Sequence, residues 1–160
     1  MAYWLLKSEP DVYSIDDLEK DGSSTWDGVR NYQARNSQLE MKKGDLALFY
    51  HSRSNPPAVA GICRVSKKAF PDATAFDPQA KYFDPKSDPE KPRWFNVEVE
   101  YVCHLPRPVP LSEIRARRSL QKMVLVNNSR LSVQPVTPAA FATICKMGGL
   151  DGVPGKKKPQ

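Results

Sequence analysis

The sequence contains few of the residues that build metal centres and nucleophilic active sites. Its 160 residues include two histidines and three cysteines, and Cys63, Cys103 and Cys145 stand too far apart to form a CxxC pair. A structural zinc site needs four ligands, which usually come in closely spaced pairs. We therefore expect no metal and no cofactor, and we interpret the cysteines as small core residues of a protein from a reducing compartment.

Long apolar runs are also absent. No stretch approaches the roughly 18 consecutive apolar residues of a membrane helix. The first four residues, Met1 to Trp4, have neither the basic nor the apolar region of a signal peptide. These absences predict a soluble, cytoplasmic protein without a membrane partner, and we take the chain as a monomer.

Basic residues outnumber acidic ones. The chain has 24 Lys and Arg against 18 Asp and Glu, a net charge of +6, and an isoelectric point near 9.3. Residues 149–160 supply +2 of this excess, because Lys156, Lys157 and Lys158 face a single acid, Asp151. A domain this basic is a candidate for binding nucleic acid. Surface lysine without a dedicated phosphate-binding face gives the same excess, so charge leaves both interpretations open.

Hydrophobic patterning predicts a single domain. A chain of this length with 40% apolar residues can bury one sizeable core. Prolines at 106, 108, 110 and 135 are expected to end strands, and Thr137 with Pro138 to start the last helix. We expect strands at residues 3–7, 46–51, 58–67, 94–103 and 130–134, and helices at residues 32–41, 111–123 and 139–147, with a short one through Leu18 after a Ser14–Asp17 capping box.

These elements predict an α+β fold on a strongly curved sheet or small barrel. The domain is expected over residues 1–148, followed by a disordered basic tail over residues 149–160. Residues 70–92 form a long polar loop with five prolines. A loop this long inside a compact domain is usually functional or is wrapped over the surface.

The densest group of side chains suited to binding lies in residues 26–36. Trp26 and Tyr32 offer flat faces, Arg30 and Arg35 offer cations, and Asn31 offers an amide that can pair in both directions. A nucleobase on its backbone needs these three kinds of group. Purely structural interpretations stay open for three of these residues. In them Trp26 anchors its loop on the core, and Arg30 and Asn31 serve helix capping and surface solvation.

Two strand ends carry further polar groups. Tyr50, His51 and Ser52 follow an apolar strand, but neighbours along a strand point to opposite faces, which argues against a Ser–His nucleophile. Lys7 and Glu9 flank Ser8 before a proline and are either an acid–base pair or a strand-end salt bridge.

Three more sets of residues are ambiguous from sequence. Trp94, at the end of the long loop, fits the core or a site. Arg115, Arg117 and Arg118 fit a solvated helix face or phosphate contacts. Alternation in the strand predicted at residues 130–134 places the polar residues Arg130, Ser132 and Gln134 on one face.

Taken together, these stretches resemble the EVE domain family of the PUA-like superfamily. The resemblance covers residues 2–147 in the family's order. It implies a PUA-like fold, a curved mixed β-barrel with short helices at its rim, and a pocket for a modified base, such as a 5-methylated cytosine, in DNA or RNA. The matching stretches are YWLLKSEP at 3–10, WDGVRNYQARN at 26–36, FYHS at 49–52, FPD at 70–72, FDP at 76–78, PRW at 92–94 and RLSVQP at 130–135.

The resemblance implies which residues line or border the pocket. Two groups are expected, one around the base and one along the phosphate backbone. The first is Ser8, Trp26, Arg30, Asn31, Tyr32, Tyr50, His51 and Trp94, and the second is Arg35, Arg115, Arg117, Arg118 and Arg130.

We therefore interpret the chain as a binding module and not as an enzyme, one that captures a flipped or single-stranded modified base. A PUA-like hydrolase or ribonuclease using Lys7 and Glu9 is the alternative, and a module that docks an acidic partner on residues 115–118 is a third. Family members in animals carry a long basic N-terminal extension that this sequence lacks. That difference favours a bacterial, stand-alone form.

Overall fold

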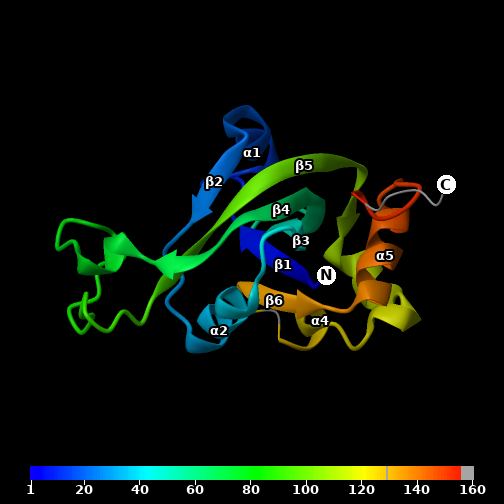
Figure 1. Ribbon diagram of the computed structural model, residues 1–160. Coiled ribbons are helices and arrows are strands. Elements are labelled where there is room, and N and C mark those ends of the chain that lie inside the picture. The colour runs from blue at the N-terminus through cyan, green and yellow to red at the C-terminus, as the bar shows by residue number, and fades with distance from the viewer. Residues whose placement is uncertain (129, 156–160) are drawn as a thin grey trace.

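The computed structural model describes residues 1–128 and 130–155. Within them the chain forms a six-stranded mixed sheet with the strand order β2-β5-β4-β3-β1-β6, with helices around it (Figure 1). The strands are β1 (Tyr3–Ser8), β2 (Ser23–Trp26), β3 (Leu46–His51), β4 (Ala58–Pro71), β5 (Phe95–Pro110) and β6 (Val133–Val136). The α-helices are α1 (Ile15–Asp21), α2 (Tyr32–Glu40), α3 (Leu111–Ala116), α4 (Val124–Asn127) and α5 (Pro138–Met147), and two 3₁₀ turns are η1 (Ala73–Phe76) and η2 (Arg118–Leu120).

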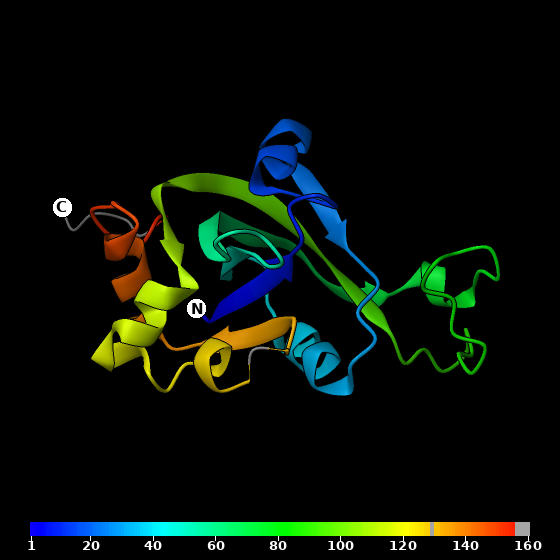
Figure 2. The same ribbon diagram turned by 180° about the vertical axis from the view of Figure 1, so that it is seen from behind.

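The sheet is strongly curved and open. β1 and β3 pair in parallel, and the other neighbouring strands are antiparallel. β2 and β6 are its edges in the described part of the chain, so the strands do not close into a complete barrel there. The long strands β4 and β5 bend across the molecule, and the loop between them projects to one side (Figures 1 and 2). The α+β prediction is confirmed.

Both faces of the central strands are buried. Along β1, Tyr3 and Leu5 enter one apolar cluster with Phe141 of α5, whereas Trp4 and Leu6 enter a second cluster on the opposite face. Alternate residues of a strand point to opposite faces, so an uninterrupted apolar run is what a doubly covered strand requires. β1 and β3 consequently lie where the sequence predicted them.

Strand β2 was not predicted. Its four residues, Ser23 to Trp26, are mostly polar and alternate between exposed and partly buried positions. They pair with β5 through the register Ser23↔Glu100 to Trp26↔Val97. An edge strand with so little apolar surface has no periodic signal, and only the backbone pairing with β5 defines it.

Strand β5 runs seven residues beyond its predicted end at Cys103. The expectation that Pro106 and Pro108 end it was wrong, whereas Pro110 is its last residue. The register with β4 jumps from Gly61↔His104 to Val59↔Val109, which takes Pro106 and Pro108 out of the ladder. Proline has no backbone N–H to donate to the ladder. Because the bulge leaves Pro106 and Pro108 unpaired with β4, no donor is required from them.

The helix predicted over residues 111–123 is broken into α3 and η2, with α4 following from residue 124. Ile114 and Leu120 are both buried, yet at 100° per residue they would point about 120° apart on one continuous helix. The break turns both side chains into the core. Sequence periodicity over so few apolar residues could not show it.

The strand predicted at residues 130–134 is shifted to Val133–Val136. Pro135 lies within it, opposite Trp4, because β6 is an edge strand and needs no donor on its outer side. Arg130 precedes the strand, and Gln134 is fully buried with its Nε2 donating to the Leu131 carbonyl at 2.7 Å. The prediction of a shared polar face was therefore wrong.

The predicted helix starts are confirmed. Ser14 and Asp17 form a capping box, the Asn31 side chain accepts from the Ala34 N–H, and Thr137 caps α5 with Pro138 following. None of the helices in the described ranges is long and apolar enough to cross a membrane.

Two of the three cysteines are core residues, as predicted. Burial raises the pKa of the Cys63 and Cys145 thiols to about 12, and both are free of disulfides. Leu150 and Val153 pack partly buried against the cluster that contains Phe141. Lys156, Lys157 and Lys158 of the expected basic tail lie outside the described residues.

Candidate functional site

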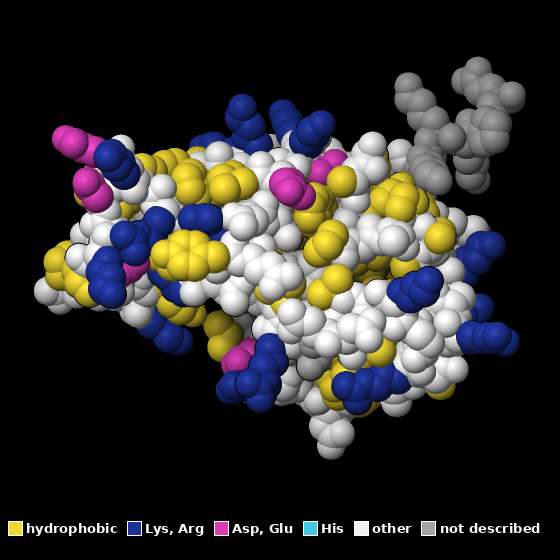
Figure 3. All heavy atoms as spheres, turned by 90° about the horizontal axis from the view of Figure 1, so that it is seen from below, with side chains coloured by type: hydrophobic (Ala, Val, Ile, Leu, Met, Phe, Trp, Pro, Cys, Tyr) yellow, Lys and Arg dark blue, Asp and Glu magenta, His cyan; other side chains and the backbone are white. Residues whose placement is uncertain are grey.

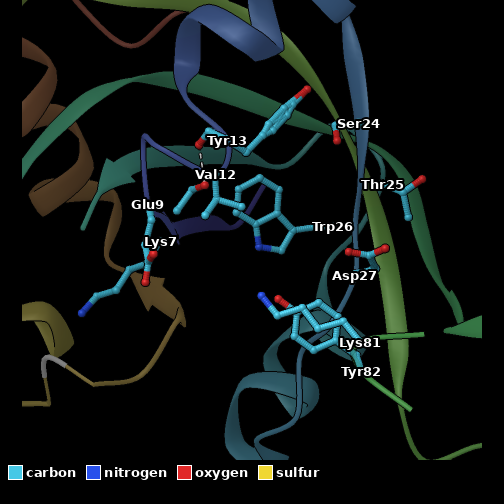
Figure 4. A pocket seen from close by; sticks show the side chains of 11 residues that line it. Lys7, Glu9, Val12, Tyr13, Ser24, Thr25, Trp26, Asp27, Lys81 and Tyr82 are labelled. Atoms are coloured by element: carbon cyan, nitrogen blue, oxygen red, sulfur yellow. Dashed lines mark hydrogen bonds between the residues drawn. The ribbon is translucent and has the colours of Figure 1, made fainter. Parts of the chain in front are cut away.

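A cavity of about 380 Å³ opens at the carboxyl end of β1. Its walls come from four places in the chain: the end of β1, the turn before α1, strand β2, and the long loop between β4 and β5 (Figure 4). Its lining residues are Lys7, Ser8, Glu9, Val12, Tyr13, Ser24, Thr25, Trp26, Asp27, Lys81 and Tyr82.

Trp26 provides an aromatic wall of this cavity. The residue ends β2 and is partly buried, with its ring edge-on to Phe49 at a centroid distance of 5.5 Å. In Figure 4 the indole lies between Val12 and Tyr13 on one side and Lys81 and Tyr82 on the other. One edge of the indole is thus fixed by the core while the ring borders open space.

Polar groups surround the indole. Burial raises the pKa of the Asp27 carboxyl, and the negative charge of Asp72 raises it further. Burial lowers the pKa of Lys7, whose ammonium lies 5.5 Å from the Tyr50 ring centroid. The Ser8 hydroxyl donates to the Tyr13 carbonyl at 2.5 Å. A planar ligand with a polar edge would meet both an acceptor and donors here.

Arg30 holds the long loop and does not point into the cavity as a free cation. Its guanidinium makes five hydrogen bonds: two to the Tyr82 carbonyl at 2.6 and 3.0 Å, and one each to the Val29 carbonyl, Asp72 Oδ2 and Thr74 Oγ1. Five is the full donor capacity of arginine. Arg30 is not among the residues that line this cavity, and its donors are used within the protein.

Asp72 is the buried partner of Arg30. Its side chain is 0% exposed, and it accepts from Arg30 at 3.0 Å and from the Gly28 N–H at 3.1 Å. Burial on its own would raise the pKa of this carboxyl, but hydrogen bonds from Thr74, Gly28 and Arg30 outweigh burial and hold the pKa below its usual value. The loop is therefore anchored by an ionised carboxylate.

Four other predicted residues lie together beside the cavity. Tyr32, which is 51% exposed, stacks on Trp94 with ring centroids 4.9 Å apart. The Arg35 guanidinium lies over the Tyr32 ring, 4.7 Å from its centroid. Trp94 is buried, and its indole N–H donates to Asp84 at 2.6 Å. The Asn31 side-chain oxygen caps α2. None of the four belongs to the lining of the Trp26 cavity.

Tyr50 and His51 lie elsewhere. Tyr50 is buried in the cluster of Phe141. His51 Nε2 accepts from the Ile15 N–H at 3.1 Å, and burial lowers the pKa of its imidazole. His51 borders a second cavity of about 390 Å³, which it shares with His104. The structure thus joins only Ser8 and Trp26 of the eight predicted pocket residues in one cavity.

The predicted backbone-binding arginines are spread widely. Arg115, Arg117, Arg118 and Arg130 are exposed, on α3, at the end of α3, on η2 and before β6. Figure 3 shows Lys and Arg side chains distributed over the face on which α2, β6 and α4 lie, with few acidic ones. Within the described ranges, no three His, Cys, Asp or Glu side chains gather closely enough to hold a metal ion.

Sequence reasoning missed several lining residues. Tyr82 and Lys81 belong to the long loop that length alone marked as functional, so a weak signal for them existed. Tyr13 and Val12 belong to the turn before α1, and Ser24 and Thr25 to β2, the strand that had no signal. Asp27 follows Trp26 directly.

The curved mixed sheet with rim helices and a cavity at the carboxyl end of β1 defines a protein of the PUA-like class. The chain belongs to the EVE domain family, whose family model matches residues 2–147. This confirms the resemblance seen in the sequence.

Relatives and solved structures agree with this assignment. The chain is 39% identical over 159 residues to thymocyte nuclear protein 1 of Homo sapiens, covering 88% of this chain and 71% of the relative. A structure from Leishmania major has 49% identity and a TM-score of 0.88, covering 92% of this chain and 94% of its own. The human THYN1 protein in complex with DNA containing 5-methylcytosine has 36% identity and a TM-score of 0.89, covering 99% and 100%.

Proposed function

We propose that this protein captures a single modified base of a DNA or RNA strand in the Trp26 cavity. The observation that carries the proposal is the partly buried indole of Trp26 in a cavity of about 380 Å³ with polar walls. This volume lies within the range of roughly 300–1,000 Å³ that small-molecule sites occupy. Stacking on an aromatic ring is the interaction that unpaired bases use in most single-strand binding proteins.

Three side chains would contact the polar edge of such a base. Asp27 follows Trp26 and has a carboxylate at the cavity wall. Carboxylates accept from the exocyclic amine of cytosine. The hydroxyls of Ser24 and Thr25 both donate and accept. This combination fits a base of the cytosine type better than thymine, which has no exocyclic amine.

The human THYN1 complex with DNA containing 5-methylcytosine supports the same ligand class, because that structure matches 99% of this chain. Lys7 and Lys81 are the two cationic residues that line the cavity, and we propose that they contact the phosphates of a bound nucleotide. The more distant Arg35, Arg115, Arg117, Arg118 and Arg130 remain proposed contacts to a longer strand. Burying one methyl group contributes only about 0.8 kcal/mol, so a large preference for a methylated base requires a further hydrogen bond or a closely fitting wall.

Binding to short oligonucleotides that differ in one base tests the proposal. Single strands carrying cytosine, 5-methylcytosine or thymine at one position would be titrated at two salt concentrations by fluorescence anisotropy. The modified cytosine is expected to bind about threefold or more tightly than cytosine. The ratio of the affinities for the modified and unmodified cytosine strands is expected to persist at high salt. The contribution of phosphate-backbone contacts, which both strands share, is expected to fall.

A different pattern would overturn the proposal. Equal binding to all three strands, abolished by salt, would show that only the basic surface attracts them. Duplexes with the same bases provide the comparison for extrusion, because flipping a base costs a few kcal/mol. Weaker binding to the duplex than to the single strand is expected.

We also propose that the protein is a binding module and not an enzyme. Lys7 and Glu9 do line the same cavity, which keeps an acid–base pair under consideration. Glu9 Oε1, however, pairs with Arg53 Nε at 3.3 Å on the exposed rim, and the Lys7 ammonium lies over the Tyr50 ring. The two groups therefore have separate partners.

Replacing Lys7 by methionine and Glu9 by glutamine distinguishes the two possibilities. We expect wild type and double variant to leave labelled RNA and small amides equally intact, because the two side chains do not act together. Gel electrophoresis and an ammonia-release assay would measure this. Cleavage by the wild type that the double variant lacks would establish the hydrolase instead.

A further inference from the structure

We infer that Tyr82 is the second wall of the base-binding slot and that Gly28 and Arg30 set its position. The inference rests on the proposed function for the identity of the ligand. The placement of Tyr82 rests on geometry alone. Tyr82 would contact the ligand, whereas Gly28 and Arg30 would act only by positioning Tyr82.

Gly28 forms the floor on which the Tyr82 ring packs. The residue has φ +75°, in the left-handed region that glycine adopts without strain. A Cβ atom at this position would lie 2.6 Å from Cε2 and 2.7 Å from Cδ2 of Tyr82. These are atoms of a rigid ring, so any side chain at position 28 would displace the tyrosine.

The Arg30 side chain holds Tyr82 through the backbone carbonyl of Tyr82. Nε and Nη2 both donate to the Tyr82 carbonyl, and the guanidinium carbon lies 5.7 Å from the Tyr82 ring centroid. Two of the other three hydrogen bonds of Arg30 reach Asp72 and Thr74 at the start of the same loop. Both ends of the segment 72–82 are thus tied to one guanidinium, which defines where the ring stands.

Tyr82 and Trp26 line one cavity from different parts of the chain, and Figure 4 places Tyr82 on the side of the indole away from Tyr13. A planar base entering between them would contact both side chains. Such a ligand has to be separated from its neighbours in the strand. The substrate class is therefore an unstacked base, either extruded from a duplex or in a single strand.

A double-mutant cycle tests the positioning. Tyr82→Ala is expected to weaken binding of the preferred oligonucleotide about tenfold. Gly28→Ala is expected to weaken it several-fold in the wild-type background and much less in the Tyr82→Ala background, because the displaced ring is then gone and only the backbone strain remains. Fluorescence anisotropy at constant salt measures all four proteins.

Gly22→Ala is the matched control. Gly22 also has positive φ, +81°, but an added Cβ there would meet no described atom within 4 Å. Both alanine variants share the backbone strain, so only an effect of the Tyr82 contact separates their affinities. Circular dichroism and thermal unfolding would show that each variant is folded.

The outcomes separate the inference from the proposed function. Base preference in the wild type with additive effects of Gly28→Ala and Tyr82→Ala would overturn the inference alone. No base preference in the wild type would overturn the proposed function. Should Gly28→Ala fail to fold, Tyr82→Phe takes its place: retained affinity supports stacking by the ring, and a loss equal to that of Tyr82→Ala refutes it.

Discussion

Replacing Arg30 by alanine is expected to lower the free energy of unfolding by about 3 kcal/mol. The substitution leaves the Asp72 carboxylate without its ion pair in a position where its side chain is 0% exposed. It also removes two donors from the Tyr82 carbonyl and one from Thr74. A buried charge without a partner costs more than any one of these hydrogen bonds contributes. Urea denaturation at neutral pH, followed by circular dichroism, measures the change.

Two further variants isolate the cause. Arg53 pairs with Glu9 at the surface, where its side chain is 83% exposed, so Arg53→Ala is expected to cost less than about 1 kcal/mol. Adding Asp72→Asn to Arg30→Ala removes the unpaired charge, and the double variant is expected to be more stable than the sum of the single effects predicts. If Arg30→Ala and Arg53→Ala lowered the free energy of unfolding equally, the buried Arg30–Asp72 pair would not stabilise the fold.

Replacing Trp26 by alanine is expected to weaken binding of the preferred oligonucleotide by about tenfold or more. Aromatic stacking contributes roughly 1–3 kcal/mol per base, and 1.4 kcal/mol corresponds to a factor of ten. The indole is also an apolar wall of the cavity, so its loss removes a surface against which a methyl group would be sensed. The variant is therefore expected to lose the preference between modified and unmodified cytosine as well.

Tyr32→Ala provides the comparison for this effect. Tyr32 is the more exposed aromatic, 51% accessible, and is stacked on Trp94 outside the cavity lining. We expect a change of about twofold or less, uniform across the three oligonucleotides. If Tyr32→Ala abolished the base preference and Trp26→Ala preserved it, the binding platform would be the Tyr32–Trp94 stack and not the cavity.

The strands that the sequence predicted well are those buried on both faces. β1 and β3 are uninterrupted apolar runs, and burial on two sides requires such runs whatever the rest of the chain does. β2 is mostly polar, and β6 holds Pro135 at the sheet edge. Edge strands depend on partners far away in the sequence, and local patterns carry no information about those partners.

The site was predictable in part for the same reason. Trp26 stood out because an aromatic in a polar segment is unusual locally. The hydrogen bonds of Arg30 could not be predicted from the sequence, since its main partners, Asp72 and Tyr82, lie 42 and 52 residues away. Asn31 was correctly recognised as a possible cap because capping is a local interaction. Tyr50 and His51 looked available only because the strand sequence does not show what packs over it.

The prolines at the far end of β5 make this segment a poor template for strand addition. Beyond Tyr101 the side of β5 away from β4 has no neighbouring strand in the described part of the chain, because β2 ends its pairing at Glu100. An unpaired edge of this length is a template on which a second chain can add a strand. Pro106, Pro108 and Pro110 supply no N–H groups along this segment. The bend that shapes the sheet thus also denies an aggregating strand the donors it would need.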